Sequence, residues 1–135
     1  MIAEYIAGEL TSFGTLGTDL FYSSLPDLPN NAICVFDESG TVQPYQSDYG
    51  SDWVGVQILM RGTYSYVKQL WDIHNFITGI NEIDTDDFYL VTSTVQNVPF
   101  QVEVDDKGRR VWSAHYMYLL AQKDNTNRIP TLEGS

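Results

Sequence analysis

Hydrophobic and polar positions recur with a helical period at the start of the chain and with strand-like patterns further on. Apolar residues spaced by three or four positions between Ile2 and Phe13 predict a short amphipathic helix that ends near Gly14. The continuous apolar run at residues 32–37 predicts a buried strand. Residues 53–61 alternate between apolar and other side chains, which predicts a second strand with one apolar face.

Segment 63–80 carries the pattern of the main helix, with Thr63 or Ser65 placed to cap its start and Gly79 placed to end it. The apolar stripe on one face of this helix comprises Val67, Leu70, Trp71, His74 and Ile77. Further apolar residues widen the arc beyond one stripe: Tyr66, Ile73, Phe76 and Ile80. We therefore expect a helix that is either sandwiched inside the fold or packed on a neighbouring subunit.

The second half of the chain predicts three further strands, at residues 87–96, 98–106 and 109–122. Pro99 lies near the start of the middle strand, where an edge position tolerates the missing donor. Gly108 supplies positive φ for a hairpin turn before the last strand. The resulting fold class is α+β: a mainly antiparallel sheet of about five strands with two helices packed on one face.

A single domain is expected over residues 1–122, followed by a flexible C-terminal tail at 123–135. Residues 14–31 are predicted to form an irregular connection. The segment 38–53 is predicted to be a long polar loop that contains Tyr45, Tyr49 and Trp53. These aromatic residues either anchor a partner protein or belong to a mobile surface loop, and the sequence leaves both interpretations open.

Charge excludes one class of partner. The chain has 18 acidic and 7 basic residues, for a net charge of −11, and residues 1–60 contain no Lys or Arg. Phosphate binding needs clustered basic residues, so specific nucleic-acid binding is not expected. No apolar stretch approaches the roughly 20 residues of a membrane helix. The N-terminus also lacks a basic signal-peptide region, so we expect synthesis in the cytoplasm.

Candidate catalytic and metal-binding residues are few. His74 and His115 are the only histidines, and each is interpreted as a hydrogen-bonded structural residue. Cys34 lies in an apolar run and is predicted to be a small buried hydrophobe. The acidic run 84–87 lacks the register of a calcium loop and is interpreted as a solvated loop. The sequence therefore predicts no catalytic residue, no cofactor and no metal site.

Arg61 lies at a strand-to-helix junction and has three interpretations: a catalytic or anion-binding group, a surface arginine, or a partner in a structural or inter-subunit ion pair. No acid, base or nucleophile converges on it in the sequence. Because carboxylates are abundant and a guanidinium binds them through two hydrogen bonds, we favour the ion pair.

Four stretches in this order resemble a known family: LGTDLFYSSLPDLPNNAICVFDESG, WVGVQILMRGTYSYVKQLWDIHNFI, DDFYLVTSTVQNVPF and DDKGRRVWSAHYM. They are similar to the tail-terminator and small minor capsid proteins of long-tailed bacteriophages, over roughly residues 5–120.

The resemblance implies an α+β structural virion protein without enzymatic activity or cofactor. Such proteins assemble, usually as a hexameric ring, on the last ring of the tail-tube protein. They stop tube growth and present the surface that joins the tail to a head-completion or neck protein. DNA passes through the lumen without specific binding, and we expect an acidic lumen here.

Candidate contact residues follow from the pattern and the resemblance together. The expected subunit interface contains Arg61, Tyr66, Ile73 and Phe76. The expected contact with the tail tube or neck contains Tyr45, Tyr49 and Trp53. Two alternatives remain: a head–tail connector or neck completion protein, and a small ligand-binding or enzymatic domain that uses Arg61 with His74 or His115.

Overall fold

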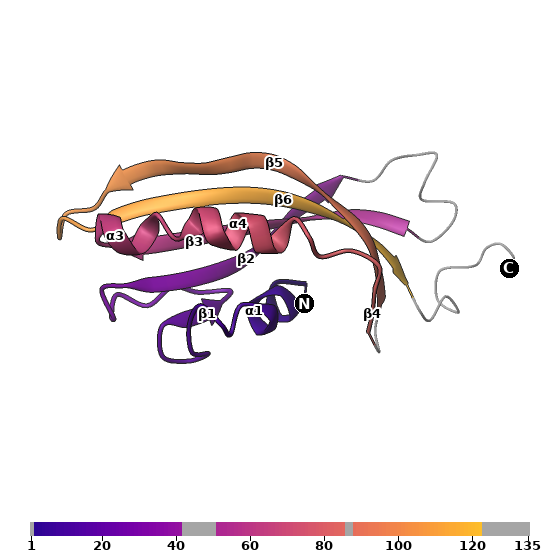
Figure 1. The fold of residues 1–135 in the computed structure, drawn as a ribbon, viewed down its shortest axis with the longest axis horizontal. Helices are drawn as coiled ribbons and strands as arrows, with labels where there is room; N and C mark the ends of the chain where they lie inside the picture. Colours follow the sequence, from indigo (N-terminus) through magenta and orange to yellow (C-terminus); the bar gives the residue numbers. More distant parts are fainter. Residues whose placement is uncertain (1, 42–50, 86–87, 123–135) are drawn as a thin grey trace, which may run out of the picture.

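The computed structural model describes residues 2–41, 51–85 and 88–122 of the chain (Figure 1). The elements are α1 (Ile2–Glu9), β1 (Leu20–Tyr22), β2 (Ala32–Thr41), β3 (Ser51–Gly62), α3 (Tyr64–Val67), α4 (Leu70–Ile77), β4 (Ile83–Asp84), β5 (Phe88–Val104) and β6 (Arg110–Gln122). None of the helices in these ranges is long and apolar enough to cross a membrane.

One sheet organises the fold, with the strand order β1-β2-β3-β6-β5-β4. The short strand β1 pairs in parallel with β2, and the remaining neighbours pair antiparallel. The sheet is therefore mixed, and β1 and β5 lie on opposite sides of its three central strands (Figure 1).

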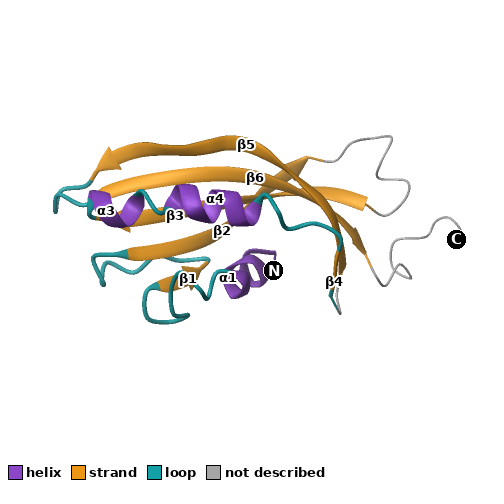
Figure 2. Ribbon diagram, in the orientation of Figure 1, coloured by secondary structure: helices purple, strands orange, loops and turns teal. Residues whose placement is uncertain are grey.

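All three described helices pack on the same face of this sheet (Figure 2). Alternation along β3 turns Val56, Ile58 and Met60 toward the helices, where all three are fully buried. The partner strand β6 adds Tyr116 and Tyr118 to the same core. Burial of each large aliphatic side chain contributes about 1.5–3 kcal/mol, so this face supplies most of the stabilising area.

The predicted α+β class is confirmed, but the strand count differs. The predicted strands 87–96 and 98–106 are one continuous strand, β5. Pro99 suggested a boundary, but the strand accommodates it by register shifts between Val95 and Phe100. The short strands β1 and β4 lie in segments that were predicted to be irregular or looped. Each consists of only two or three residues that pair with a longer neighbouring strand.

The predicted main helix is two short helices, α3 and α4, separated at Lys68 and Gln69. The backbone hydrogen bonds there join residues three apart, as in a 3-10 turn, and Gln69 N–H donates to Tyr66 O at 3.1 Å. The buried stripe is Val67, Leu70, Ile73 and Ile77. Trp71, which was predicted in the stripe, is exposed instead, and Ile73 takes its place in the core.

The predicted loop 38–53 is shorter in the structure, because β2 continues to Thr41 and β3 begins at Ser51. Trp53 pairs with Thr41 and Leu119 inside the sheet and is half-buried. Tyr45 and Tyr49 lie outside the described residues, as does the predicted tail at 123–135. The domain boundary at residue 122 stays a prediction.

Candidate assembly surfaces

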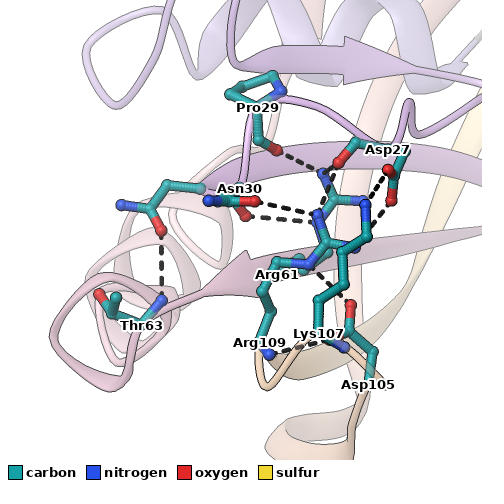
Figure 3. Close-up of polar contacts among 9 residues, drawn as sticks. Asp27, Pro29, Asn30, Arg61, Thr63, Asp105, Lys107 and Arg109 are labelled. Carbon is teal, nitrogen blue, oxygen red and sulfur yellow. Dashed lines mark hydrogen bonds and ion pairs between the residues drawn. The ribbon is translucent and has the colours of Figure 1, made fainter.

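Arg61 is the second-last residue of β3, and only 5% of the residue is exposed. Its Nη2 donates to the carbonyl oxygens of Asp27 at 3.1 Å and Pro29 at 2.5 Å, and its Nε donates to Asn30 O at 3.3 Å (Figure 3). These three carbonyls belong to the loop between β1 and β2. Arg61 therefore fixes a loop that lies more than thirty residues away in the sequence.

Arg109 holds the same loop from the β5–β6 turn. It donates to Asp27 O at 2.6 Å and Asp27 Oδ1 at 3.0 Å, and its Nε reaches Asp105 Oδ2 at 2.8 Å. Lys107 also pairs with the Asp27 carboxylate (Figure 3). We call this set the loop clamp: Arg61, Arg109 and Lys107 with Asp105 and the loop 27–30.

Contacts within the loop clamp shift the pKa values of Asp27, Asp105 and Arg61. Hydrogen bonds from Lys107 and Arg109 lower the pKa of Asp27 below its ordinary value. Burial alone would raise the pKa of Asp105, but hydrogen bonds from Arg109 and Lys107 lower it. Burial and the adjacent Arg109 cation lower the pKa of Arg61, which nevertheless stays protonated at neutral pH.

The structure thus assigns Arg61 an internal structural role. Within the described part of the chain, the hydrogen bonds of Arg61 go to backbone carbonyls and not to a carboxylate, so the structural form of the favoured ion pair is not observed there. Its inter-subunit form stays a prediction. Arg109 takes the carboxylates instead. A guanidinium group with five fixed donors can satisfy several converging carbonyls, whereas a lysine cannot present the same fork.

Gly62 completes the junction between β3 and α3. A side chain at this position would meet Asn31 Oδ1 at 2.2 Å from its Cβ, and the glycine has φ of +155°. Asn31 Oδ1 is needed there because it accepts the Thr63 N–H at 3.2 Å at the start of α3. The Arg61–Gly62–Thr63 sequence is therefore a packed strand-to-helix turn with no open site for a ligand.

The other predicted interface residues fall in different environments. Ile73 is fully buried in the core of the subunit, so it has no surface to offer a neighbour. Tyr66 is half-buried. Phe76 is 40% exposed and packs edge-on against Phe13, with 6.0 Å between the ring centroids. Of the four predicted residues, Phe76 therefore presents the largest free side chain.

Both histidines are hydrogen-bonded, as predicted. His74 Nδ1 lies 2.7 Å from the hydroxyl of Tyr116, and burial lowers the pKa of His74. Cys34 is also buried as predicted, and burial raises the pKa of its thiol to about 11. A thiol in this state is a poor nucleophile at neutral pH.

The second histidine belongs to an arrangement that sequence reasoning missed. His115 Nε2 lies 3.1 Å from Ser113 Oγ, and His115 Nδ1 lies 3.0 Å from Glu38 Oε1. Glu38 pairs with Gly55 on β3, and its carboxylate reaches His115 on β6, the next strand of the sheet. The distances match those of a serine–histidine–acid triad.

Accessibility separates this arrangement from a catalytic triad. Ser113 is fully buried, and Gln57 Nε2 donates to its hydroxyl at 2.9 Å. The Phe100 ring stacks on His115, with 6.2 Å between the ring centroids. A substrate cannot reach the serine oxygen, so the four polar side chains form an internal hydrogen-bond chain. Within the described ranges, no cluster of potential ligands is suited to a metal ion.

The exposed apolar residues of β5 form the first candidate surface. From Thr92 onward, β5 has β6 on one side and no described strand on the other. Five large side chains on this stretch are 40–52% exposed: Val95, Val98, Phe100, Val102 and Val104. We call this set the β5 ridge.

The second candidate surface is a hollow at the opposite edge of the sheet. A pocket of about 600 Å³ opens between α1, β1 and the segment that joins them. Its lining includes Glu4, Leu16, Leu20, Phe21 and Tyr22, and we call it the α1–β1 pocket. Leu16 and Tyr22 are themselves substantially exposed.

Neither surface was predicted from the sequence. The only available signal was the density of valines between residues 91 and 104, and that pattern equally suits a central strand. Apart from Glu4, the pocket residues named above lay in the segment interpreted as an irregular connection. Strand order decides which strands lie at the edges, and a single sequence does not reveal that order.

Comparison with known proteins adds the family. The model of one family, described as bacteriophage tail terminator protein, matches residues 10–120. A comparison with curated proteins gave no match. The matched segment spans β1 to most of β6 and includes the loop clamp and the β5 ridge. The chain therefore belongs to the bacteriophage tail terminator family of structural viral proteins.

Proposed function

We propose that this protein forms a ring, most simply a hexamer, that caps the phage tail tube and stops its growth. The observation that carries the proposal is the family match over residues 10–120. The free ring surface then joins the tail to a head-completion or neck protein. The protein is made in the host cytoplasm and resides at the head-proximal end of the tail.

The distribution of apolar surface supports assembly as the working activity. Five apolar side chains of the β5 ridge are about half exposed, and Tyr64, Trp71 and Phe76 are exposed on α3 and α4. Exposed apolar side chains are common at contact sites for other proteins. The buried serine and the enclosed arginine give no comparable support to an enzymatic role.

The charge distribution supports passage of DNA through the ring without binding. Three of the five described basic residues, Arg61, Lys107 and Arg109, are committed to the loop clamp. Acidic groups therefore dominate the remaining surface even more than the net charge of −11 indicates. An acidic lumen repels the polyanion and lets it slide.

The contact with the tail tube or neck is proposed for the segment between β2 and β3. Tyr45 and Tyr49 belong to this segment, and Trp53 follows it on β3. Large aromatic residues commonly anchor protein–protein contacts.

Tail length in particles assembled without this protein tests the proposal. A terminator limits growth, so its removal should give tails of variable and excessive length in electron micrographs. Resupply of the wild-type protein should restore one length and head joining. Tails of normal length that lack heads would contradict the proposal and identify a connector or neck completion protein instead.

A further inference from the structure

We propose that the β5 ridge of one subunit docks into the α1–β1 pocket of the next copy of the same chain. This inference rests on the proposed ring and names the surfaces that close it. Its occupant is a second copy, and the contact is head to tail.

Position in the sheet is the first argument. β1 and α1 lie at one edge, and the open part of β5 lies at the other, with β2, β3 and β6 between them (Figure 1). A ring of identical subunits needs two different surfaces on separate sides of each subunit, since every contact is heterologous. Exposed apolar side chains on one edge and a hollow on the other meet that requirement.

Chemical match is the second argument. The ridge presents one phenylalanine and four valines, and the pocket presents Leu16, Phe21 and Tyr22. Apolar side chains that are half exposed in the isolated subunit gain most when another apolar surface removes them from water. A pocket of about 600 Å³ has room for several of these side chains.

Charge complementarity is the third argument. The exposed Arg110 side chain lies beside the ridge, where it accompanies Val104 in register and donates to Gln101 Oε1 at 3.1 Å. The pocket lining carries the exposed acid Glu4, and residues 1–60 have no base to oppose it. Glu103 is also exposed on β5, so the charge match consists of Arg110 with Glu4, and it favours contact between unlike edges.

The backbone of β5 indicates how the contact forms. Register shifts occur at four places along its ladder with β6, and Pro99 removes one backbone donor. Bulges and proline hinder continuation of a sheet across an edge. The ridge therefore binds through its side chains, and the neighbouring subunit does not extend the sheet.

Cysteine cross-linking tests this geometry. We would place Val102→Cys on the ridge and Tyr22→Cys on the pocket, in separate chains and together in one chain, and add a short bifunctional maleimide. The reaction would be run with and without tail tubes. The wild type is the background control, since its Cys34 is buried. Asn75→Cys, on the exposed side of α4, is the matched control for random collision.

A head-to-tail contact predicts a specific pattern on denaturing gels. Each single variant alone gives no cross-link, a mixture of the two gives dimers only, and the double variant gives a ladder that ends in a closed ring. Dimers from one single variant alone would overturn the inference, because they require contact between like edges. Failure of the mixture to exceed the Asn75→Cys control, with and without tubes, would also overturn it.

This test is separable from that of the proposed function. Overlong tails without the protein, combined with absent ridge–pocket cross-links, would reject the interface and retain the terminator. The expected cross-links combined with unchanged tail lengths would retain the interface and reject the terminator.

Discussion

The loop clamp and the β5 ridge invert the usual placement of charge and apolar surface. The clamp encloses Arg61 and Arg109 until each is less than a tenth exposed, whereas Val102 on the ridge is 52% exposed. The clamp cations are satisfied by carbonyls and carboxylates within the subunit. The ridge side chains have no comparable cover in the described part of the chain.

This difference separates two tasks. An enclosed cation with all its partners inside the chain serves folding, because breaking it leaves buried polar groups unpaired. An exposed apolar ridge serves association, because it contributes little to the isolated subunit. Changes in the clamp should therefore lower stability, and changes in the ridge should affect assembly alone.

The largest effect on stability is expected for Arg61→Met. The substitution keeps most of the side-chain volume but leaves the carbonyls of Pro29 and Asn30 without this donor, and the carbonyl of Asp27 with Arg109 alone. The free energy of unfolding should fall by about 3 kcal/mol in a denaturant titration. Arg110→Met, at an exposed position, is the control and should change it by less than about 0.5 kcal/mol. Equal effects of the two substitutions would remove the distinction between the clamp and the surface.

Gly62→Ala should have the next largest effect. Its new methyl group would meet Asn31 Oδ1 at 2.2 Å and displace the amide that accepts the Thr63 N–H. We expect a loss of about 2 kcal/mol in the free energy of unfolding, from overpacking and backbone strain. Gly8→Ala, where nothing lies within 4 Å, is the matched control and should be neutral or stabilising. A neutral Gly62→Ala would show that the junction is not closely packed.

Ser113→Ala tests the internal hydrogen-bond chain. Removing the hydroxyl deprives Gln57 and His115 of a partner at 2.9 and 3.1 Å, respectively. We expect a loss of about 1 kcal/mol in thermal or chemical unfolding, with tail termination intact. Loss of termination in a variant that stays folded would assign Ser113 a direct functional role.

Acid should weaken the clamp in a predictable direction. The pKa values of Asp27 and Asp105 lie below their ordinary value of 3.8 in the folded chain, so the unfolded chain binds protons first as pH falls. The contribution of these two carboxylates to stability is complete above their pKa in the unfolded chain, and it is lost as pH falls through their lower pKa in the folded chain. Asp27→Asn should therefore weaken the pH dependence of the free energy of unfolding between about pH 5 and pH 2. Asp106→Asn, in the β5–β6 turn, is the control, because it removes one carboxylate that lies outside the loop clamp.

Val102→Glu should have the smallest effect on the isolated subunit. The side chain is exposed at a sheet edge, so the free energy of unfolding should change by less than about 0.5 kcal/mol. Association should nevertheless be lost, since a carboxylate would be carried into a pocket that is lined by apolar side chains and Glu4. Light scattering on the folded variant checks this expectation. Unchanged association would place the subunit contact elsewhere.

Sequence reasoning found the elements whose burial pattern is local. The apolar patterns of α1, β2 and β3 indicate the element type, the alternation along β3 also indicates its core face, and the structure confirms them. The fused strand β5 escaped it, because the effect of Pro99 depends on bulges formed with β6.

The clamp and the two edges could not be predicted from the sequence. Arg61 was prominent in the sequence, but its partners are carbonyl oxygens, and every residue carries one. Only the folded path of the loop 27–30 aims three of them at one guanidinium group. The valines of β5 likewise became a candidate surface only when the strand order placed them at an edge.

Growth of tail tubes in the presence of purified protein tests the central claim most directly. Tube protein of the same phage would be polymerised with the wild type, with Val102→Glu or with Asn75→Glu, which carries the same change at an exposed position outside the ridge and the pocket. Tube lengths would be measured by negative-stain electron microscopy. The wild type and Asn75→Glu should both stop growth, and the folded Val102→Glu variant should leave tubes as long as those grown without any added protein. Tubes that are equally short with Val102→Glu and with the wild type would contradict the account.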